Sequence, residues 1–176
     1  MNRMQDIKIE KITLNIGIGE AGDKLDKAVR LLKEISQSNP VKTKTMKRIP
    51  GWNIRPKLTI GTKVTLRGKK AEDTLKKLFK AVNNKIAVRK FDKNGNFSFG
   101  VREYINIPGI EYNPEIGIIG LETAVTLMRP GFRVKNRRLK RSKIGKNHLI
   151  TKEQSMEFIK KTFNINITEK EEIDDY

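Results

Sequence analysis

Three glycines near the N-terminus have the spacing of a phosphate-binding loop. Gly17, Gly19 and Gly22 fit the pattern GxGxxG between a segment of strand character and one of helical character. In dinucleotide-binding domains such glycines let the backbone approach a pyrophosphate at a helix N-terminus. Those domains also need an acid after the second strand, yet no Asp or Glu occurs from residue 35 to residue 71. An NAD(P)-binding enzyme is therefore the disfavoured alternative.

Few other side chains could support catalysis or bind a metal. The chain has no cysteine and one histidine, which excludes disulfides, thiolate zinc sites, cysteine nucleophiles and multi-histidine metal centres. The single histidine, His148, lies in a basic segment without a nucleophile pattern nearby. We therefore expect a protein that is not an enzyme and that has no metal and no cofactor.

The distribution of charge favours a nucleic-acid partner. Lys and Arg number 38 against 20 Asp and Glu, a net charge of +18. Two segments without any acid, 35–71 and 123–152, each hold ten of these bases, so the rest of the chain sums to 18 − 20 = −2. Uncompensated repulsion within such segments destabilises a fold unless an anion is bound, and nucleic acid is the anion that long basic segments most often meet.

Apolar periodicity predicts a sheet with helices. Period-two alternation predicts strands over 12–18, 41–48, 59–67 and 121–128, a further extended segment at 132–135, and a hairpin of 87–92 with 96–101 about a type I′ turn at Asn94-Gly95. Helical spacing predicts helices over 23–35, with Asp23 as its cap, and 71–83, and the capping box of Thr151 and Gln154 begins a third. Residues 105–120 are predicted to form a long irregular connection.

This order of elements predicts an α+β fold. We expect a single domain over residues 1–167, with an antiparallel or mixed sheet, helices packed on one face and the other face open. Residues 168–176 hold five acids and one lysine and are expected to form a mobile acidic tail. No stretch reaches the roughly 18 apolar residues of a membrane span, and the N-terminus lacks the apolar run of a signal peptide, so we expect a soluble, intracellular protein.

The open face of the sheet is the predicted RNA-binding surface. Alternation places Thr13 and Asn15 on the side opposite the apolar residues of their strand, and Lys63, Thr65 and Arg67 on the same side of another. Hydroxyls, amides and cations of this kind suit phosphates and 2′-hydroxyls. Further basic and polar residues of the first acid-free segment join this predicted site: Lys42, Thr43, Lys44, Lys47 and Arg48. Bases of the second acid-free segment are also expected to face RNA: Arg129, Arg133, Lys135, Arg137, Arg138, Lys140, Arg141 and Lys143.

Three aromatic residues allow more than one interpretation. Phe97 and Phe99 alternate in a predicted strand and could stack on bases, but the segment lacks the residues of the RNP signature, so we predict core packing. Trp52 lies between Pro50 and Pro56 in a predicted exposed loop. Contact with a partner and local packing both remain open for its indole.

Four segments in chain order resemble the large-subunit ribosomal protein L5 family in its archaeal form. They are KITLNIGIGEA (11–21), KVTLRG (63–68), GNFSFGVRE (95–103) and RPGFRV (129–134), and the resemblance runs from about residue 8 to residue 167. It implies a cytoplasmic, ribosome-bound structural protein that binds 5S rRNA in the central protuberance through a sheet face. A general RNA chaperone is the weaker alternative, distinguished by lack of preference for 5S rRNA.

The resemblance also assigns individual positions. Asn15 and Thr65 match RNA-contacting positions of the family, and the family's RNA-contacting glutamine aligns with Ser38, where Gln37 or Asn39 could substitute. The segment 49–60 corresponds to a loop that reaches the elbow of P-site tRNA. Its expected contact residues are Trp52, Asn53, Arg55 and Lys57. Other large-subunit components and a small-subunit protein are further implied partners, whose surfaces these residues do not identify.

Overall fold

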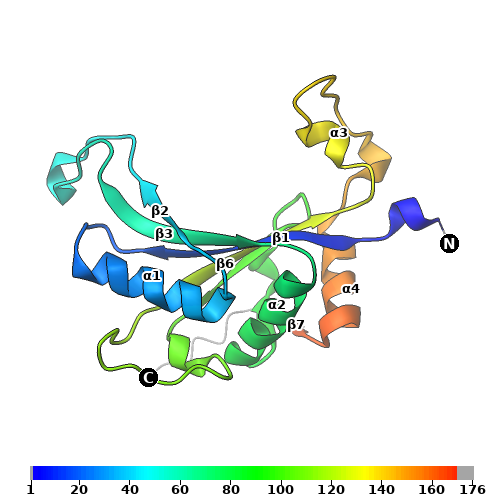
Figure 1. Ribbon diagram of the computed structural model, residues 1–176. Coiled ribbons are helices and arrows are strands. Elements are labelled where there is room, and N and C mark those ends of the chain that lie inside the picture. Colours follow the sequence, from blue (N-terminus) through cyan, green and yellow to red (C-terminus); the bar gives the residue numbers. More distant parts are fainter. Residues whose placement is uncertain (1, 170–176) are drawn as a thin grey trace.

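A five-stranded antiparallel sheet forms the centre of the computed structural model, which describes residues 2–169 (Figure 1). Its strands lie in the order β2 (Val41–Lys44), β3 (Thr59–Leu66), β1 (Lys8–Gly17), β6 (Leu121–Met128) and β5 (Phe97–Val101). Every neighbouring pair is antiparallel. A second, two-stranded sheet pairs β4 (Lys85–Ala87) with β7 (Asn166–Thr168) in parallel. The α+β fold predicted from the sequence is confirmed.

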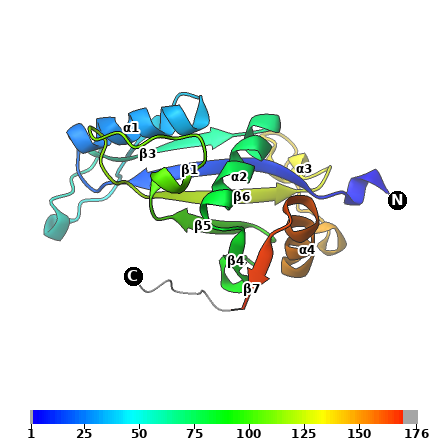
Figure 2. The same ribbon diagram turned by 90° about the horizontal axis from the view of Figure 1, so that it is seen from below.

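Helices cover one face of the large sheet. α1 (Asp23–Ser36) and α2 (Lys69–Ala81) lie on this face, and α4 (Lys152–Phe163) lies next to β7, beyond the edge of the sheet that β5 forms (Figure 2). The apolar side of β1 packs against the two helices, and Leu14, Leu32 and Leu75 are all 0% exposed. The core therefore lies between the helices and one face of the sheet, so the opposite face is left to solvent. Within residues 2–169, none of the helices has the length and apolar character needed to cross a bilayer.

A group of phenylalanines extends this core towards β5. The ring of Phe79 on α2 stacks on Phe99 with centroids 5.4 Å apart and meets Phe163 of α4 edge-on at 5.3 Å. Phe97 stacks on Phe91 at 5.1 Å, and both are buried. The core interpretation of Phe97 and Phe99 is confirmed.

The predicted hairpin over 87–101 is wrong, although its turn exists. The N–H of Asp92 donates to the carbonyl of Asn96 at 2.7 Å, which closes a three-residue loop. Gly95 has a φ of +76° but Asn94 does not have positive φ, so the turn is not type I′. A single bridge, Phe91 with Phe97, follows the turn before the two segments separate. β5 then pairs with β6 instead, and β4 pairs with β7.

Other predictions fail at the ends of elements. The extended segment at 132–135 is wrong: β6 ends before the Pro130-Gly131 turn, and the short helix α3 (Arg133–Asn136) follows. β2 ends at Lys44, where the register with β3 shifts, and does not continue to residue 48. α1 has Gly22 rather than Asp23 as its N-cap residue.

The C-terminal elements confirm the capping box. Thr151 accepts from the N–H of Gln154, and the Gln154 side chain accepts in return from the N–H of Thr151, so α4 begins as predicted. Thr168, placed by sequence in a mobile tail, is the last residue of β7. Residues 170–176 of that predicted tail lie outside the described residues.

Candidate nucleic-acid interface

Two rows of polar side chains lie on the face of the sheet opposite α1 and α2. Thr13 of β1 is paired with Thr65 of β3, and Asn15 is paired with Lys63. All four are exposed or half-buried, whereas Leu14 between them is 0% exposed. The structure therefore brings together four of the residues that alternation predicted for the open face.

An arm formed by residues 41–66 rises at one end of this face (Figure 1). It continues beyond β2 and β3 through backbone hydrogen bonds, including Thr45 N–H to the Leu58 carbonyl at 2.9 Å. At the tip, Ile49 and Ile54 exchange both N–H···O bonds, at 3.0 and 3.1 Å, and Ile54 is 5% exposed. The arm carries exposed residues of the predicted rRNA-binding and tRNA-contact sets: Lys44, Lys47, Arg48, Trp52, Asn53, Arg55 and Lys57.

The arm tip presents its tryptophan to solvent. Trp52 is 72% exposed, although its backbone N–H is bound to the carbonyl of Ile49 at 3.2 Å. Of the two interpretations of this residue, the structure therefore does not support local packing of the indole. The indole lies on an ordered turn, between Pro50 and the exposed Arg55.

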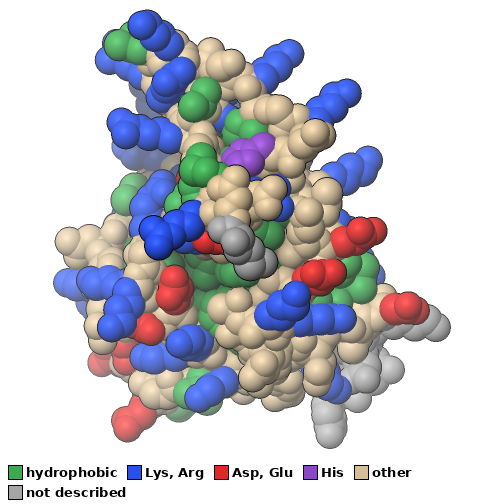
Figure 3. Space-filling view, turned by 90° about the vertical axis from the view of Figure 1, so that its right-hand side faces the viewer, with side chains coloured by type: hydrophobic (Ala, Val, Ile, Leu, Met, Phe, Trp, Pro, Cys, Tyr) green, Lys and Arg blue, Asp and Glu red, His purple; other side chains and the backbone are tan. Residues whose placement is uncertain are grey.

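A basic lobe of residues 130–148 rises at the other end, on the same side of the sheet as the arm (Figure 1). In Figure 3 this upper part of the molecule shows Lys and Arg, whereas the Asp and Glu visible from that side lie lower. The exposed cations of the lobe are Arg133, Lys135, Arg137, Arg138, Lys140, Arg141, Lys143 and Lys146. The open face therefore lies between two basic projections, which correspond to the two acid-free segments.

Arg129 belongs to the interior and not to this surface. It is 7% exposed, and its Nη2 donates to Oε1 of Gln154 at 2.9 Å. Its Nη1 donates to the carbonyl of Leu149 at 3.3 Å. The sequence-based placement of Arg129 among RNA-facing bases is therefore corrected: its guanidinium joins β6 to the segment that precedes α4.

His148 has a structural environment at the base of the lobe. Its Nε2 lies 2.9 Å from the carbonyl oxygen of Pro130, and its ring meets Phe132 edge-on at 5.7 Å. Lys135 also contacts this phenylalanine, with Nζ 5.8 Å from the centroid of the Phe132 ring. These contacts hold the two ends of the lobe together.

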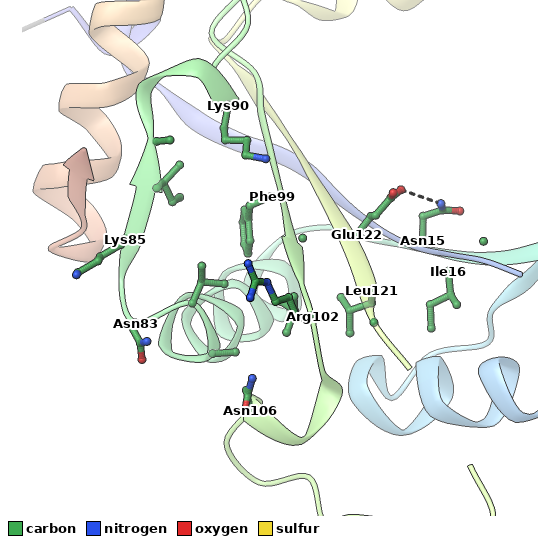
Figure 4. Close-up of a pocket in the computed structure, with 18 of the residues that line it drawn as sticks. Asn15, Ile16, Asn83, Lys85, Lys90, Phe99, Arg102, Asn106, Leu121 and Glu122 are labelled. Carbon is green, nitrogen blue, oxygen red and sulfur yellow. Dashed lines mark hydrogen bonds between the residues drawn. The ribbon is translucent and has the colours of Figure 1, made fainter. Parts of the chain in front are cut away.

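A carboxylate that sequence reasoning missed also lies on the open face. Glu122 of β6 is paired with Asn15 of β1, and the Asn15 Nδ2 donates to the Glu122 Oε2 at 3.2 Å (Figure 4). Both side chains project away from the side of the strands on which Ile16 and Leu121 lie (Figure 4). They line one end of a cavity of about 730 Å³ that also borders β5 and β4. Alternation within 121–128 could have put Glu122 on a polar side, but not beside Asn15.

Three further predicted residues have partners within the protein or lie away from the rows. Lys42 donates to the carboxylate of Asp26 on α1 at 2.6 Å, which places its ammonium on the helix side of the sheet. This hydrogen bond and the charge of Lys42 lower the pKa of Asp26. Arg67 lies 3.6 Å from the Glu10 carboxylate. Ser38 is half-buried in the connection between α1 and β2.

Thr43 remains at the open face. It is paired with Gly61 of β3, and a Cβ added to Gly61 would lie 3.0 Å from the Thr43 Oγ1. The Thr43 hydroxyl therefore lies over Gly61, which is two residues from Lys63 along β3.

The glycine motif does not form a dinucleotide site. β1, which ends at Gly17, lies between two antiparallel neighbours, whereas a dinucleotide-binding unit requires a parallel sheet. The N–H groups of Ile18 and Gly19 both donate to the carbonyl of Ile60 at 2.9 Å, so they are not presented to a phosphate. The NAD(P)-binding alternative is wrong.

Comparison with known proteins agrees with this geometry. Residues 2–55 match the family described as Ribosomal protein L5, and residues 59–158 match the description of the C-terminus of the same family. The large ribosomal subunit protein uL5 of Nanoarchaeum equitans is 53% identical over 93% of this chain and 97% of its own length. The uL5 proteins of Sulfurisphaera tokodaii, at 49% over 96% of both chains, and Methanosphaera stadtmanae, at 45% over 95% of this chain and 99% of its own, are similar as well. The chain therefore belongs to the ribosomal protein L5 family and is a structural ribosomal protein, not an enzyme.

Proposed function

We propose that the chain binds 5S rRNA through the open face of its sheet and helps to attach this RNA in the central protuberance of the large subunit. The observation that carries the proposal is the pairing of Thr13 with Thr65 and of Asn15 with Lys63 on the open face. This face lies between the basic arm and the basic lobe. We expect the protein to occur in the cytoplasm, bound to the ribosome.

The geometry of the face supports different roles for its cations and for its neutral hydrogen-bonding groups. Neighbouring strands lie about 4.8 Å apart and hold their side chains on a rigid backbone, so hydroxyl and amide groups are presented in fixed positions. Cations on the arm and the lobe can engage phosphates on either side. Phosphate contacts supply affinity and orientation, whereas neutral hydrogen-bonding groups supply selectivity.

A second contact is proposed for the arm tip. Trp52 is 72% exposed and Arg55 is exposed beside it, so the tip offers an aromatic surface and a guanidinium to a second RNA. Following the family pattern, we propose that this RNA is the elbow of P-site tRNA. Other large-subunit components and a small-subunit protein are further proposed partners.

The test is selective binding. The protein is titrated into labelled 5S rRNA and, separately, into an unrelated RNA duplex of equal length, with fluorescence anisotropy as the readout. Thr65→Ala should weaken 5S rRNA binding by about 0.5–3 kcal/mol because it removes one hydrogen-bonding group from the face. Thr162→Ala, an exposed threonine on α4, is the matched control and should bind as the wild type does.

Two outcomes would reject the proposal. Equal affinity of the wild type for both RNAs would favour a general RNA chaperone. The wild type could instead prefer 5S rRNA while the double variant Thr65→Ala with Lys63→Gln keeps the same preference. That result would place the 5S rRNA site elsewhere on the protein.

A further inference from the structure

Asn15 and Glu122 have glycines beside them on the open face. Gly17 follows Asn15 on the same side of β1, and Gly100 of β5 is paired with Glu122. A Cβ added at Gly17 would meet nothing within 4 Å, and one at Gly100 would meet only the Leu121 carbonyl, at 4.0 Å. The space above these glycines is open, so a partner can approach the pair closely.

The hydrogen bond within the pair fixes which atoms face outward. An ionised carboxylate can only accept, so the nitrogen of the Asn15 amide, not its oxygen, must face Glu122. The Asn15 Oδ1 is then directed away from Glu122. Three oxygens are presented close together: the Oδ1 of Asn15 and both carboxylate oxygens of Glu122. The pair is therefore an acceptor site within a strongly basic protein.

Such a site repels phosphate and favours hydrogen-bond donors. Lys63, one strand away from Asn15 on the other side, can take a phosphate in its place. Strand spacing separates the backbones of Glu122 and Lys63 by about 10 Å, so one RNA strand can offer a donor to the first and a phosphate to the second. In A-form RNA the wide, shallow minor groove displays 2′-hydroxyls and the amino groups of guanines, which are donors.

We propose that Glu122, held by Asn15, is a specificity-determining residue that accepts a hydrogen bond from a ribose 2′-hydroxyl in the minor groove of the bound RNA. This inference rests on the proposed RNA-binding function and deepens it. Glu122 lowers affinity for anions in general and raises it for RNA that presents a donor at this point. It selects RNA over a DNA strand of the same sequence.

The experiment compares Glu122→Gln with the wild type on two nucleic acids. The probes are labelled 5S rRNA and the single-stranded DNA of the same sequence, measured by anisotropy at one fixed salt concentration. Glu122 is exposed, so both variants Glu122→Gln and Glu122→Ala should fold, which circular dichroism checks. Glu34→Gln, an exposed acid on α1 on the helix-covered side, makes the same charge change away from the face.

The ratio of RNA to DNA affinity is the deciding quantity. We expect Glu122→Gln and Glu122→Ala to bind DNA more tightly and to reduce the RNA-to-DNA ratio by about tenfold, the size of one charge-assisted hydrogen bond. Glu34→Gln should leave the ratio unchanged. If the Glu122 variants instead raise both affinities by one common factor, Glu122 acts only through its charge and the proposal is overturned.

Substituted RNAs identify the donor and separate this proposal from the broader one. Blocks of 2′-deoxy nucleotides remove hydroxyls, and the block that removes the donor should weaken the wild type and leave Glu122→Ala unaffected. Replacing guanosine by inosine removes only the amino group and should change the affinities of both proteins equally. If every substitution affects both proteins equally, the proposal fails. The affinities of the wild type for 5S rRNA and for an unrelated duplex are measured before any variant is compared. Equal affinities would contradict the proposed function itself.

Discussion

The guanidinium of Arg129 and the side-chain amide of Gln154 lie 2.9 Å apart and join the end of β6 to the start of α4. The same Gln154 oxygen accepts from the backbone N–H of Thr151 at 3.3 Å. The Nη1 of Arg129 donates to the carbonyl of His148 at 3.4 Å and to that of Leu149 at 3.3 Å. One buried arginine therefore connects the capping box of α4, the base of the basic lobe and the central sheet.

Replacing this arginine should destabilise the fold without removing the RNA surface. Arg129→Ala leaves the carbonyls of His148 and Leu149 without their donor, so we expect the free energy of unfolding to fall by about 1–3 kcal/mol. Urea denaturation measures this. Arg133→Ala, at an exposed position in the same lobe, should change it by less than about 0.5 kcal/mol. An Arg129→Ala protein of unchanged stability that loses RNA affinity would show that the arginine contacts RNA after all.

Binding of 5S rRNA should depend steeply on salt. If the arm and the lobe together neutralise roughly six to ten phosphates, affinity should fall by about 10³ to 10⁵ between 50 and 200 mM salt. Titrations at four salt concentrations give the slope. A nearly flat dependence would contradict the role assigned to the two basic projections.

The arm tip should separate tRNA contact from rRNA binding. Trp52→Ala combined with Arg55→Ala removes two exposed side chains, while the hydrogen bonds between Ile49 and Ile54 remain. We expect unchanged stability and nearly unchanged 5S rRNA affinity, with reduced tRNA occupancy of the P site in assembled ribosomes, measured by filter binding. Lys93→Ala, an exposed lysine in the turn before β5, is the control. Loss of 5S rRNA binding in the double variant would move the tip to the rRNA interface.

The pair of Lys42 and Asp26 predicts a defined pH effect. The hydrogen bond and charge of Lys42 lower the pKa of Asp26 in the folded protein. A carboxyl with a lowered folded-state pKa contributes stability above its unfolded-state pKa and loses that contribution as the pH falls through the folded-state pKa. Lys42→Gln should raise the pKa of Asp26, measured by NMR titration of its carboxyl carbon.

The same variant tests where Lys42 points. Because its ammonium lies on the helix side of the sheet, Lys42→Gln should leave 5S rRNA affinity nearly unchanged. Lys63→Gln, a lysine of the open face, is the matched comparison and should weaken binding. Equal losses of 5S rRNA affinity in the two variants would show that Lys42 belongs to the RNA interface, as its sequence position predicts.

Local patterns were sufficient to predict the polar side of β1 and β3. Thr13, Asn15 and Thr65 alternate with apolar neighbours within their own strands, and burial of one face of a sheet forces the others outward. The neighbour of Asn15 could not be predicted in this way. Glu122 follows it by 107 residues, and only the pairing of β1 with β6 brings the two together.

Long-range pairing and burial also explain the wrong predictions. The turn at Gly95 was recognised, but β5 gains a full ladder with β6 and β4 with β7, so a hairpin between them does not form. Arg129 was predicted to face RNA because it lies in the same acid-free segment as the lobe arginines. Its guanidinium instead donates to three acceptors within the protein. A pattern along the chain does not show which partner a strand or a guanidinium will have.

The position of β1 in the sheet has a consequence for synthesis. β1 spans Lys8–Gly17 and is made early, whereas its neighbour β6 ends at Met128, so one edge of the central strand stays unpaired while more than a hundred further residues are added. Unpaired strand edges attract other chains, and the basic arm is already present at that stage. A nascent chain cut short before residue 121 carries Asn15 without Glu122. It therefore carries the basic arm without the acceptor pair, and the proposed recognition surface is complete only when β6 has joined the sheet.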